Sequence, residues 1–231
     1  MFFDPLYFII LAPAILLSLY ATIKVKATFA KYSQEPVDNG LSGAEAARQI
    51  LKKNGIVNVR VETSQGMLSD HYDPREKVVR LSPDVYNGRT IAAVAVAAHE
   101  VGHVLQDANE YAPMVLRSVA VPVAQIGSWA PYILFAIGFM LQMVQLVYIG
   151  VFLFLGVVIF QLITLPVELN ASSRAKEQVA AIGLVSPGQM EGVSKVLSAA
   201  AMTYVAAAVM ALLQLLYWLI RLGIIGGRRS N

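Results

Sequence analysis

Long apolar runs alternate with mixed polar segments along the chain and are its dominant pattern. Each run is long enough to cross a bilayer core of about 30 Å as a helix. The four runs are residues 6–23, 115–139, 144–165 and 197–220. The link between the second and third runs, around Gln142 and Gln145, is so short that it predicts a membrane hairpin. Pro122 and Pro131 predict kinks in the first helix of that hairpin.

The polar stretch between the first two runs has shorter periodicities, which predict a small α+β unit. A helix should begin at the capping-box residue Ser42 and end at Gly55. Apolar and polar residues alternate over 56–62, which predicts a half-buried strand, and 77–82 predicts a second strand. The segment 69–74 is rich in turn-forming residues and is expected to connect them.

Residues 90–106 are rich in Ala and Val and predict a buried helix capped by Thr90. This helix carries His99, Glu100 and His103 in the pattern His-Glu-x-x-His, which is typical of zinc sites. Residues four apart share one helix face, so His99 and His103 can bind one metal ion. Glu100 lies about a third of a turn from His99 and suits a general base for an attacking water. The pattern therefore favours hydrolysis of an amide bond.

A catalytic zinc ion takes three protein ligands, so one more ligand is needed. The chain contains no Cys, which leaves histidine and carboxylate side chains. Glu168 is the best candidate, on a helix that is expected to begin near Pro166. Glu177 and His71 remain open as alternatives. His71 could instead donate a hydrogen bond to a developing oxyanion, or cap its own turn.

The strand predicted over 77–82 comes just before the zinc helix, and its edge suggests a use. An extended peptide can add to an exposed strand through backbone hydrogen bonds and so be held beside the metal. The residues proposed for this role are Val78, Val79, Arg80 and Leu81. A purely structural hairpin is the alternative.

Composition supports a membrane protein. Hydrophobic residues make up 57% of the chain and charged residues 14%, which is not typical of a soluble domain. The formal net charge is +3, but the basic residues are scattered beside the apolar runs, so nucleic acid is not an expected partner. None of the runs has an ionisable residue at mid-depth, which argues against a transporter.

Basic residues also predict an orientation in the membrane. Lys24, Lys26 and Lys31 follow the first run, so the chain should start outside and enter the cytoplasm there. The hairpin then returns the chain to the cytoplasm, which places 167–194 on the same side as the zinc helix. Four spans would leave the C-terminus outside. Three arginines favour the opposite side for it: Arg221, Arg228 and Arg229.

The expected fold class is an α-helical multi-pass membrane protein with about four transmembrane helices and a small α+β, zincin-like catalytic unit in the cytoplasm. The predicted parts are an anchor (1–24), the α+β unit with the zinc helix (25–114), the hairpin (115–166), cytoplasmic helices with the third ligand (167–196), and the fourth span with a basic tail (197–231).

Four blocks of sequence carry a resemblance to a known family. They are Asp-His-Tyr-Asp-Pro-Arg at 70–75, Val-Arg-Leu-Ser at 79–82, Ala-Ala-His-Glu-Val-Gly-His at 97–103 and Pro-Val-Glu-Leu-Asn-Ala-Ser-Ser-Arg at 166–174. In this order they resemble the bacterial neutral zinc metallopeptidases of the YugP type. The resemblance covers most of the chain, including the apolar runs, and implies a membrane zinc peptidase.

That family is in turn similar to the HtpX and CAAX-prenyl membrane proteases, in which Glu-x-x-Ala-Asp follows the zinc helix. Glu168 and Ala171 match this pattern, so the resemblance implies Glu168 as the third ligand. Ser172 stands where those proteases have an Asp that orients a ligand histidine, which leaves this role to Ser172 or Asn170. Arg174 suits a contact with a substrate carbonyl, the oxyanion or a lipid phosphate.

The sequence thus predicts a zinc endopeptidase of the cell membrane that holds one Zn²⁺ at the cytoplasmic face. Its expected partners are the lipid bilayer, membrane-associated protein or peptide substrates and a possible membrane-protein partner. The alternative is a non-hydrolytic zinc-binding scaffold or regulator of a membrane complex.

Overall fold

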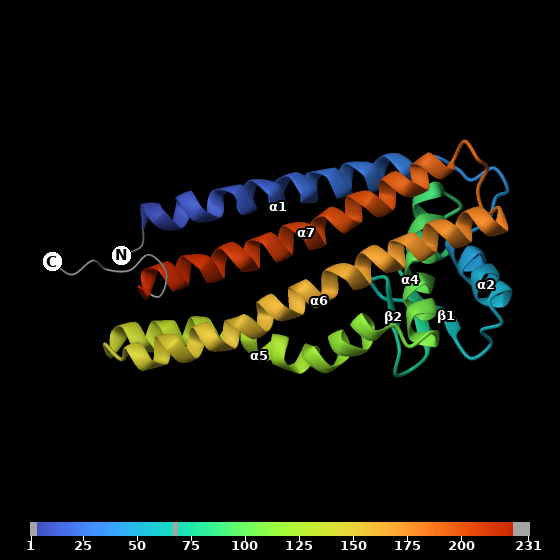
Figure 1. Cartoon of the computed structure of the whole chain (residues 1–231). Coiled ribbons are helices and arrows are strands. Elements are labelled where there is room, and N and C mark those ends of the chain that lie inside the picture. The colour runs from blue at the N-terminus through green and yellow to red at the C-terminus, as the bar shows by residue number, and fades with distance from the viewer. Residues whose placement is uncertain (1–3, 67–68, 224–231) are drawn as a thin grey trace. The chain divides into compact units, whose positions relative to one another are not determined.

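The computed structural model describes residues 4–66 and 69–223. Four of its helices are long and apolar enough to cross a membrane, and each contains one of the four apolar runs, so the helices predicted there are confirmed (Figure 1). They are α1 (Pro5–Tyr32), α5 (Ala112–Met140), α6 (Val144–Ile182) and α7 (Met190–Arg221). Arg228 and Arg229, two of the arginines that bear on the side of the C-terminus, lie outside the described residues.

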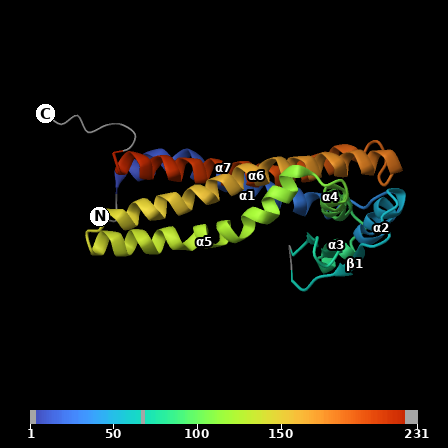
Figure 2. The same ribbon diagram turned by 60° about the horizontal axis from the view of Figure 1, so that its bottom comes forward.

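The chain divides into two compact units, and the first holds most of the apolar helix length. This unit comprises the chain up to residue 20, residues 113–166 and the chain from 204 onward. Within it the Trp218 ring meets the rings of Phe135 and Phe154 edge-on, at centroid distances of 4.4 and 4.5 Å. Helix α5 bends along its length (Figure 2). Pro122 and Pro131, the prolines at which kinks were predicted, both lie inside this helix. Proline removes a backbone hydrogen bond, which explains such a bend.

The second unit, residues 21–112 and 167–203, contains the α+β segment. Its helix α2 (Gly43–Lys53) has the predicted capping box, in which Ser42 and Glu45 exchange side chain to backbone hydrogen bonds. Gly55 follows with a φ of 69°, the left-handed conformation that glycine tolerates. These caps fix both ends of α2, as predicted.

A three-stranded sheet stands beside α2, and its strand order corrects the predicted substrate edge. The strands are β1 (Arg60–Thr63), β2 (His71–Asp73) and β3 (Val78–Leu81), in the order β1-β3-β2. β3 pairs parallel to β1 and antiparallel to β2, so both of its edges are occupied. The prediction that Val78, Val79, Arg80 and Leu81 form a free edge was therefore wrong. It failed because β2 occupies the segment that had been predicted as a turn.

Helix α6 continues through Pro166, where the sequence had predicted a helix start. Pro166 lies inside the single helix Val144–Ile182. A proline there removes only one backbone donor, and the turns on either side can keep their own hydrogen bonds. Glu168 therefore lies two residues after Pro166 within this helix rather than at a helix start.

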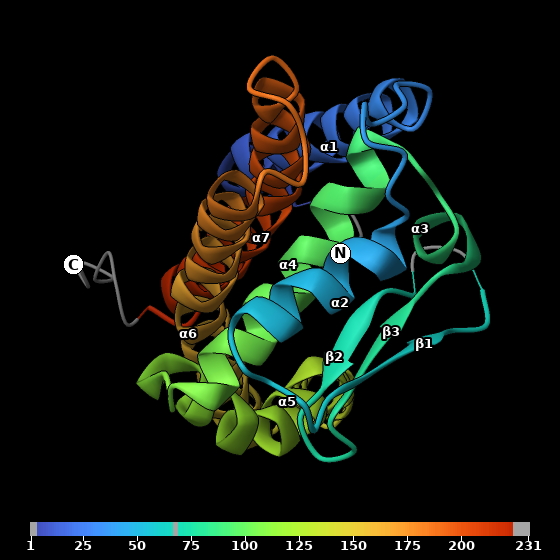
Figure 3. The ribbon, with the colours of Figure 1, turned by 90° about the vertical axis from the view of Figure 1, so that its right-hand side faces the viewer.

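The zinc helix α4 (Ile91–Ala108) lies at the centre of the second unit, and Thr90 caps it as predicted, accepting a hydrogen bond from Ala93 N at 3.3 Å. Helix α2 and the sheet lie on one side of α4, with the short helix α3 (Pro83–Tyr86) beside them (Figure 3). In the second unit, the part of α6 that begins at Val167 lies against α4 at Gly102. A Cβ on Gly102 would lie 2.5 Å from the Ala171 carbonyl oxygen, so only glycine permits this close approach.

Candidate metal centre

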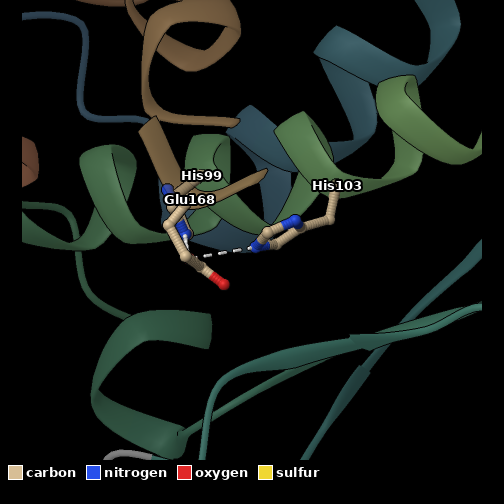
Figure 4. A group of neighbouring side chains, drawn as sticks. All are labelled: His99, His103 and Glu168. Atoms are coloured by element: carbon tan, nitrogen blue, oxygen red, sulfur yellow. Dashed lines mark hydrogen bonds and ion pairs between the residues drawn. The ribbon is translucent and has the colours of Figure 1, made fainter. Parts of the chain in front are cut away.

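His99 and His103 point from one face of α4 toward Glu168 on α6 (Figure 4). Their spacing of four residues brings the two rings to a centroid distance of 4.8 Å. His99 is partly exposed, whereas His103 and Glu168 are buried, with 7% and 1% of their surfaces exposed. The chain thus brings together residues 69 positions apart, from two helices that approach each other at Gly102.

One carboxylate oxygen of Glu168 faces both imidazoles. Glu168 Oε2 lies 3.2 Å from His99 Nε2 and 3.5 Å from His103 Nε2. One ligand atom from each of the three residues lies within 4.8 Å of the other two. Tetrahedral zinc with bonds of about 2.0–2.1 Å would separate its ligand atoms by about 3.3 Å. The two distances to Glu168 Oε2 match this separation, and two histidines with one carboxylate are donors that zinc takes.

Gln106 fixes the tautomer of His103. It is fully buried, and its side-chain amide donates to the Val167 carbonyl at 2.7 Å and to Asn170 Oδ1 at 3.1 Å. Its Oε1, which can only accept, lies 2.9 Å from His103 Nδ1. In the neutral imidazole Nδ1 must then carry the proton, which leaves Nε2, the nitrogen nearer Glu168, with its lone pair. A metal ligand needs that lone pair.

Sequence reasoning missed Gln106. Its position three residues after His103 was the available signal, because that spacing puts both side chains on one helix face. Its partners on α6 were not visible in the sequence, since they depend on how α4 and α6 pack. Asn170, one of the predicted orienting residues, acts through Gln106 rather than directly on a histidine.

Ser172 lies beside the other histidine. Its Oγ is 3.2 Å from His99 Nδ1, and the side chain is buried, with 6% exposed. A hydroxyl oxygen can accept a hydrogen bond from Nδ1–H, although without the negative charge that a carboxylate would bring. Each of the two histidines thus has a polar partner at Nδ1.

Two carboxylates make this site electronegative. Burial lowers the pKa of His103, but the hydrogen bond with Glu168 and the charges of Glu100 and Glu168 outweigh burial and raise the pKa above its ordinary value. Glu100 itself is buried in α4, with 8% of its surface exposed. An excess of negative charge in a buried site is the setting in which a divalent cation is bound.

The other predicted residues lie apart from this group. Glu177 is exposed and accepts a hydrogen bond from Ser173 Oγ at 3.1 Å. His71 is exposed on β2, and its Nδ1 lies 2.8 Å from the Ser69 carbonyl oxygen. Arg174 donates to Asn170 Oδ1 at 2.8 Å, and its guanidinium lies 6.0 Å from the centre of the Tyr111 ring.

Comparison with known proteins gives one family. The family model described as "Putative neutral zinc metallopeptidase" matches residues 7–223. A relative from Bacillus subtilis (strain 168), described as "Putative membrane protease YugP", is 49% identical over 211 residues, which cover 91% of this chain and 94% of the relative. No solved structure matches the chain. With the match spanning the His99, His103 and Glu168 group and all four apolar helices, the chain belongs to the neutral zinc metallopeptidase family.

Proposed function

We propose that this protein is a membrane-integrated zinc endopeptidase that hydrolyses peptide bonds of membrane-associated proteins or peptides. The observation that carries the proposal is the meeting of His99, His103 and Glu168 next to Glu100. Two histidines and a glutamate are the ligand set of thermolysin-type peptidases. A bound zinc ion supplies a Lewis acid that brings the pKa of water close to neutrality.

Glu100 is the general base in this proposal. It takes a proton from the attacking water while the water oxygen adds to the carbonyl carbon of the substrate. It then returns the proton to the nitrogen as the carbon–nitrogen bond breaks, so the products are a carboxylate and an amine. Gln106 and Ser172 act on the reaction indirectly, because they hold the two histidines in the tautomer and orientation that a ligand needs.

His71 and Arg174 are the proposed contacts for substrate or oxyanion. A peptide that adds to the sheet would pair with β2, the edge strand that packs against α4, and His71 belongs to that strand. Arg174 has one nitrogen bound to Asn170, and its remaining donors suit a carbonyl oxygen or a lipid phosphate.

Substrates close to the bilayer follow from the position of Glu168. It lies two residues after Pro166, on the helix that contains the apolar run 144–165. The proposed face is cytoplasmic, because lysines concentrate where α1 leaves its own apolar run. A substrate held by the bilayer would therefore reach the site at the membrane surface.

Glu100→Gln tests hydrolysis separately from metal binding. The full-length protein in neutral detergent should lose cleavage of a mixture of quenched fluorogenic peptides by about 10²–10⁴-fold, because the water loses its base. Elemental analysis should still find one zinc per chain, since none of the ligands has changed. Glu177→Gln, the same substitution at an exposed position of α6, should leave both quantities unchanged.

Glu168→Gln supplies the complementary result, loss of zinc together with activity, because an amide oxygen is a much weaker zinc ligand than a carboxylate. Cleavage by the Glu100→Gln variant at the wild-type rate would reject hydrolysis at this site and favour the scaffold role. Full zinc retention by Glu168→Gln would reject Glu168 as the third ligand.

A further inference from the structure

A cavity in the unit of residues 21–112 and 167–203 is separate from the candidate metal centre. It has a volume of about 610 Å³ and is lined by the C-terminal part of α1 and the N-terminal part of α7. The two helices are in close contact there, since a Cβ on Gly192 would lie 2.7 Å from the Tyr32 ring. Neither the zinc ligands nor Glu100 line this cavity.

One face of α1 supplies cations to the cavity. Lys24, Thr28 and Lys31 line it, and their spacing of four and three residues places them on one side of the helix. Lys26 carries the same charge but lies about half a turn away from Lys24 and does not line the cavity. The lysines of the cavity are thus distinct from the rest of the basic segment.

The facing part of α7 adds a third lysine and two hydroxyl groups. Ser194, Lys195 and Ser198 line the cavity together with one acid, Glu191. Glu191 Oε1 lies 2.5 Å from Lys195 Nζ, so it neutralises one of the three cations. Lys31 is itself ion-paired with Glu35 at 3.8 Å. The side chains of Lys31 and Lys195 are 64% and 54% exposed, so a ligand can still reach both ammonium groups.

The chemistry of this wall favours an anion with several acceptor oxygens. Three lysines face Glu191 on the cavity wall and Glu35 beside it, which lies 3.8 Å from Lys31 Nζ, so one net positive charge remains there. The serine and threonine hydroxyls provide further donors between the charges. A phosphate group offers several oxygens to such donors and carries the negative charge that the lysines require.

The position of the cavity along the two helices identifies the source of the phosphate. Lys24 directly follows the apolar run 6–23 of α1, and Lys195 lies two residues before the apolar run 197–220 of α7. Both helices thus change from apolar to polar sequence at the cavity. In a bilayer this change occurs at the level of the lipid head groups.

We propose that the cavity formed by Lys24, Lys31 and Lys195 binds the phosphate of an anionic phospholipid head group. The lysines attract the phosphate, and Thr28, Ser194 and Ser198 donate hydrogen bonds to it. The bound lipid links α1 to α7 at the membrane surface. This site is independent of the proposed peptidase activity, because it shares no residue with the metal centre.

Native mass spectrometry of the full-length protein in neutral detergent tests this site directly. Short-chain phosphatidylglycerol should bind one to one, and more tightly than phosphatidylcholine of the same chain length. Lys31→Gln and Lys195→Gln should each weaken binding about fivefold, the loss expected for one cation near a head group. Lys26→Gln is the matched control and should change the affinity less than twofold.

Equal loss with Lys26→Gln and Lys31→Gln would overturn the proposal, because a diffuse basic surface and not a cavity would then attract the lipid. Unchanged binding in the Lys31 and Lys195 variants would overturn it as well. Inorganic phosphate is the third arm: if it binds with the same lysine dependence while the lipid does not bind, the source is a soluble ion and the lipid is rejected. Glu100→Gln should bind phosphatidylglycerol like the wild type, which separates this test from that of hydrolysis.

Discussion

At the scale of single residues, Gln106 connects the two helices that carry the proposed zinc ligands. Its oxygen accepts from His103, and its amide donates to Val167 and Asn170 on the helix of Glu168. Any movement of α6 relative to α4 would therefore disturb the orientation of His103 as well as the position of Glu168. In a fully buried setting the loss of this amide leaves several polar groups without a partner.

Gln106→Leu should lower zinc affinity by about 10–100-fold, because the His103 ring loses the acceptor that orients it. Competition with a fluorescent zinc chelator measures this change. Gln106→Glu keeps an acceptor for the Nδ1 proton and should retain more of the affinity than the leucine variant. The melting temperature of the zinc-free protein should fall in both variants, since both lose the amide donors to α6.

The same substitution at Gln65, an exposed position on the turn after β1, is the control for Gln106→Leu and should leave zinc affinity unchanged. Equal zinc affinity in the Gln106→Leu and Gln106→Glu variants would show that the acceptor at His103 Nδ1 is not what Gln106 contributes.

At the scale of elements, local sequence determined the helices well and the sheet poorly. The caps at Ser42 and Thr90 are local patterns, so the starts of α2 and α4 could be predicted to the residue. β2 has only three residues and the composition of a turn, and its strand conformation comes from pairing with β3. Pairing between distant segments is invisible to periodicity, and the predicted edge strand was wrong for that reason.

The ligand set was predictable to different degrees for a similar reason. His99 and His103 lie on one helix, so their spacing alone places them together. Glu168 reaches them from α6, 69 positions after His99, and the residues alone left His71 and Glu177 open. Only the packing of α6 against α4 at Gly102 selects Glu168, and that packing depends on the tertiary fold.

Gly102→Ala tests this packing, because the substitution should stabilise the protein if the two helices are not in close contact and destabilise it if they are. Alanine normally stabilises a helix by about 1 kcal/mol relative to glycine. At Gly102 its Cβ would overlap the Ala171 carbonyl oxygen, so α4 and α6 must separate, and we expect a loss of about 1–3 kcal/mol. The variant should show a lower melting temperature and weaker zinc binding, because Glu168 moves away with α6.

Gly188→Ala is the control for Gly102→Ala, since a Cβ at Gly188 meets no atom within 4 Å. It should change the melting temperature little. A higher melting temperature for Gly102→Ala than for the wild type would contradict the close approach of the two helices.

At the scale of the whole molecule, the metal centre restricts the membrane topology. His99 lies before α5 and Glu168 lies near the end of the apolar run of α6, and the two side chains are 3.2 Å apart. Two groups in contact must be on the same side of a bilayer, so if α5 crosses the membrane, the apolar part of α6 must cross back. The contact fixes parity but not orientation, which rests on the lysines that follow the first apolar run.

Single-cysteine labelling tests both parity and orientation, because the chain has no cysteine of its own. Gln65→Cys and Gly188→Cys should react with a membrane-impermeant maleimide only after the cells are permeabilised. Met143→Cys, in the exposed link between α5 and α6, should react in intact cells. Labelling of Gln65→Cys and Gly188→Cys on opposite sides would contradict a site assembled from α4 and α6. Labelling of both in intact cells, with Met143→Cys protected, would keep the paired crossing but place the proposed peptidase site outside the cytoplasm.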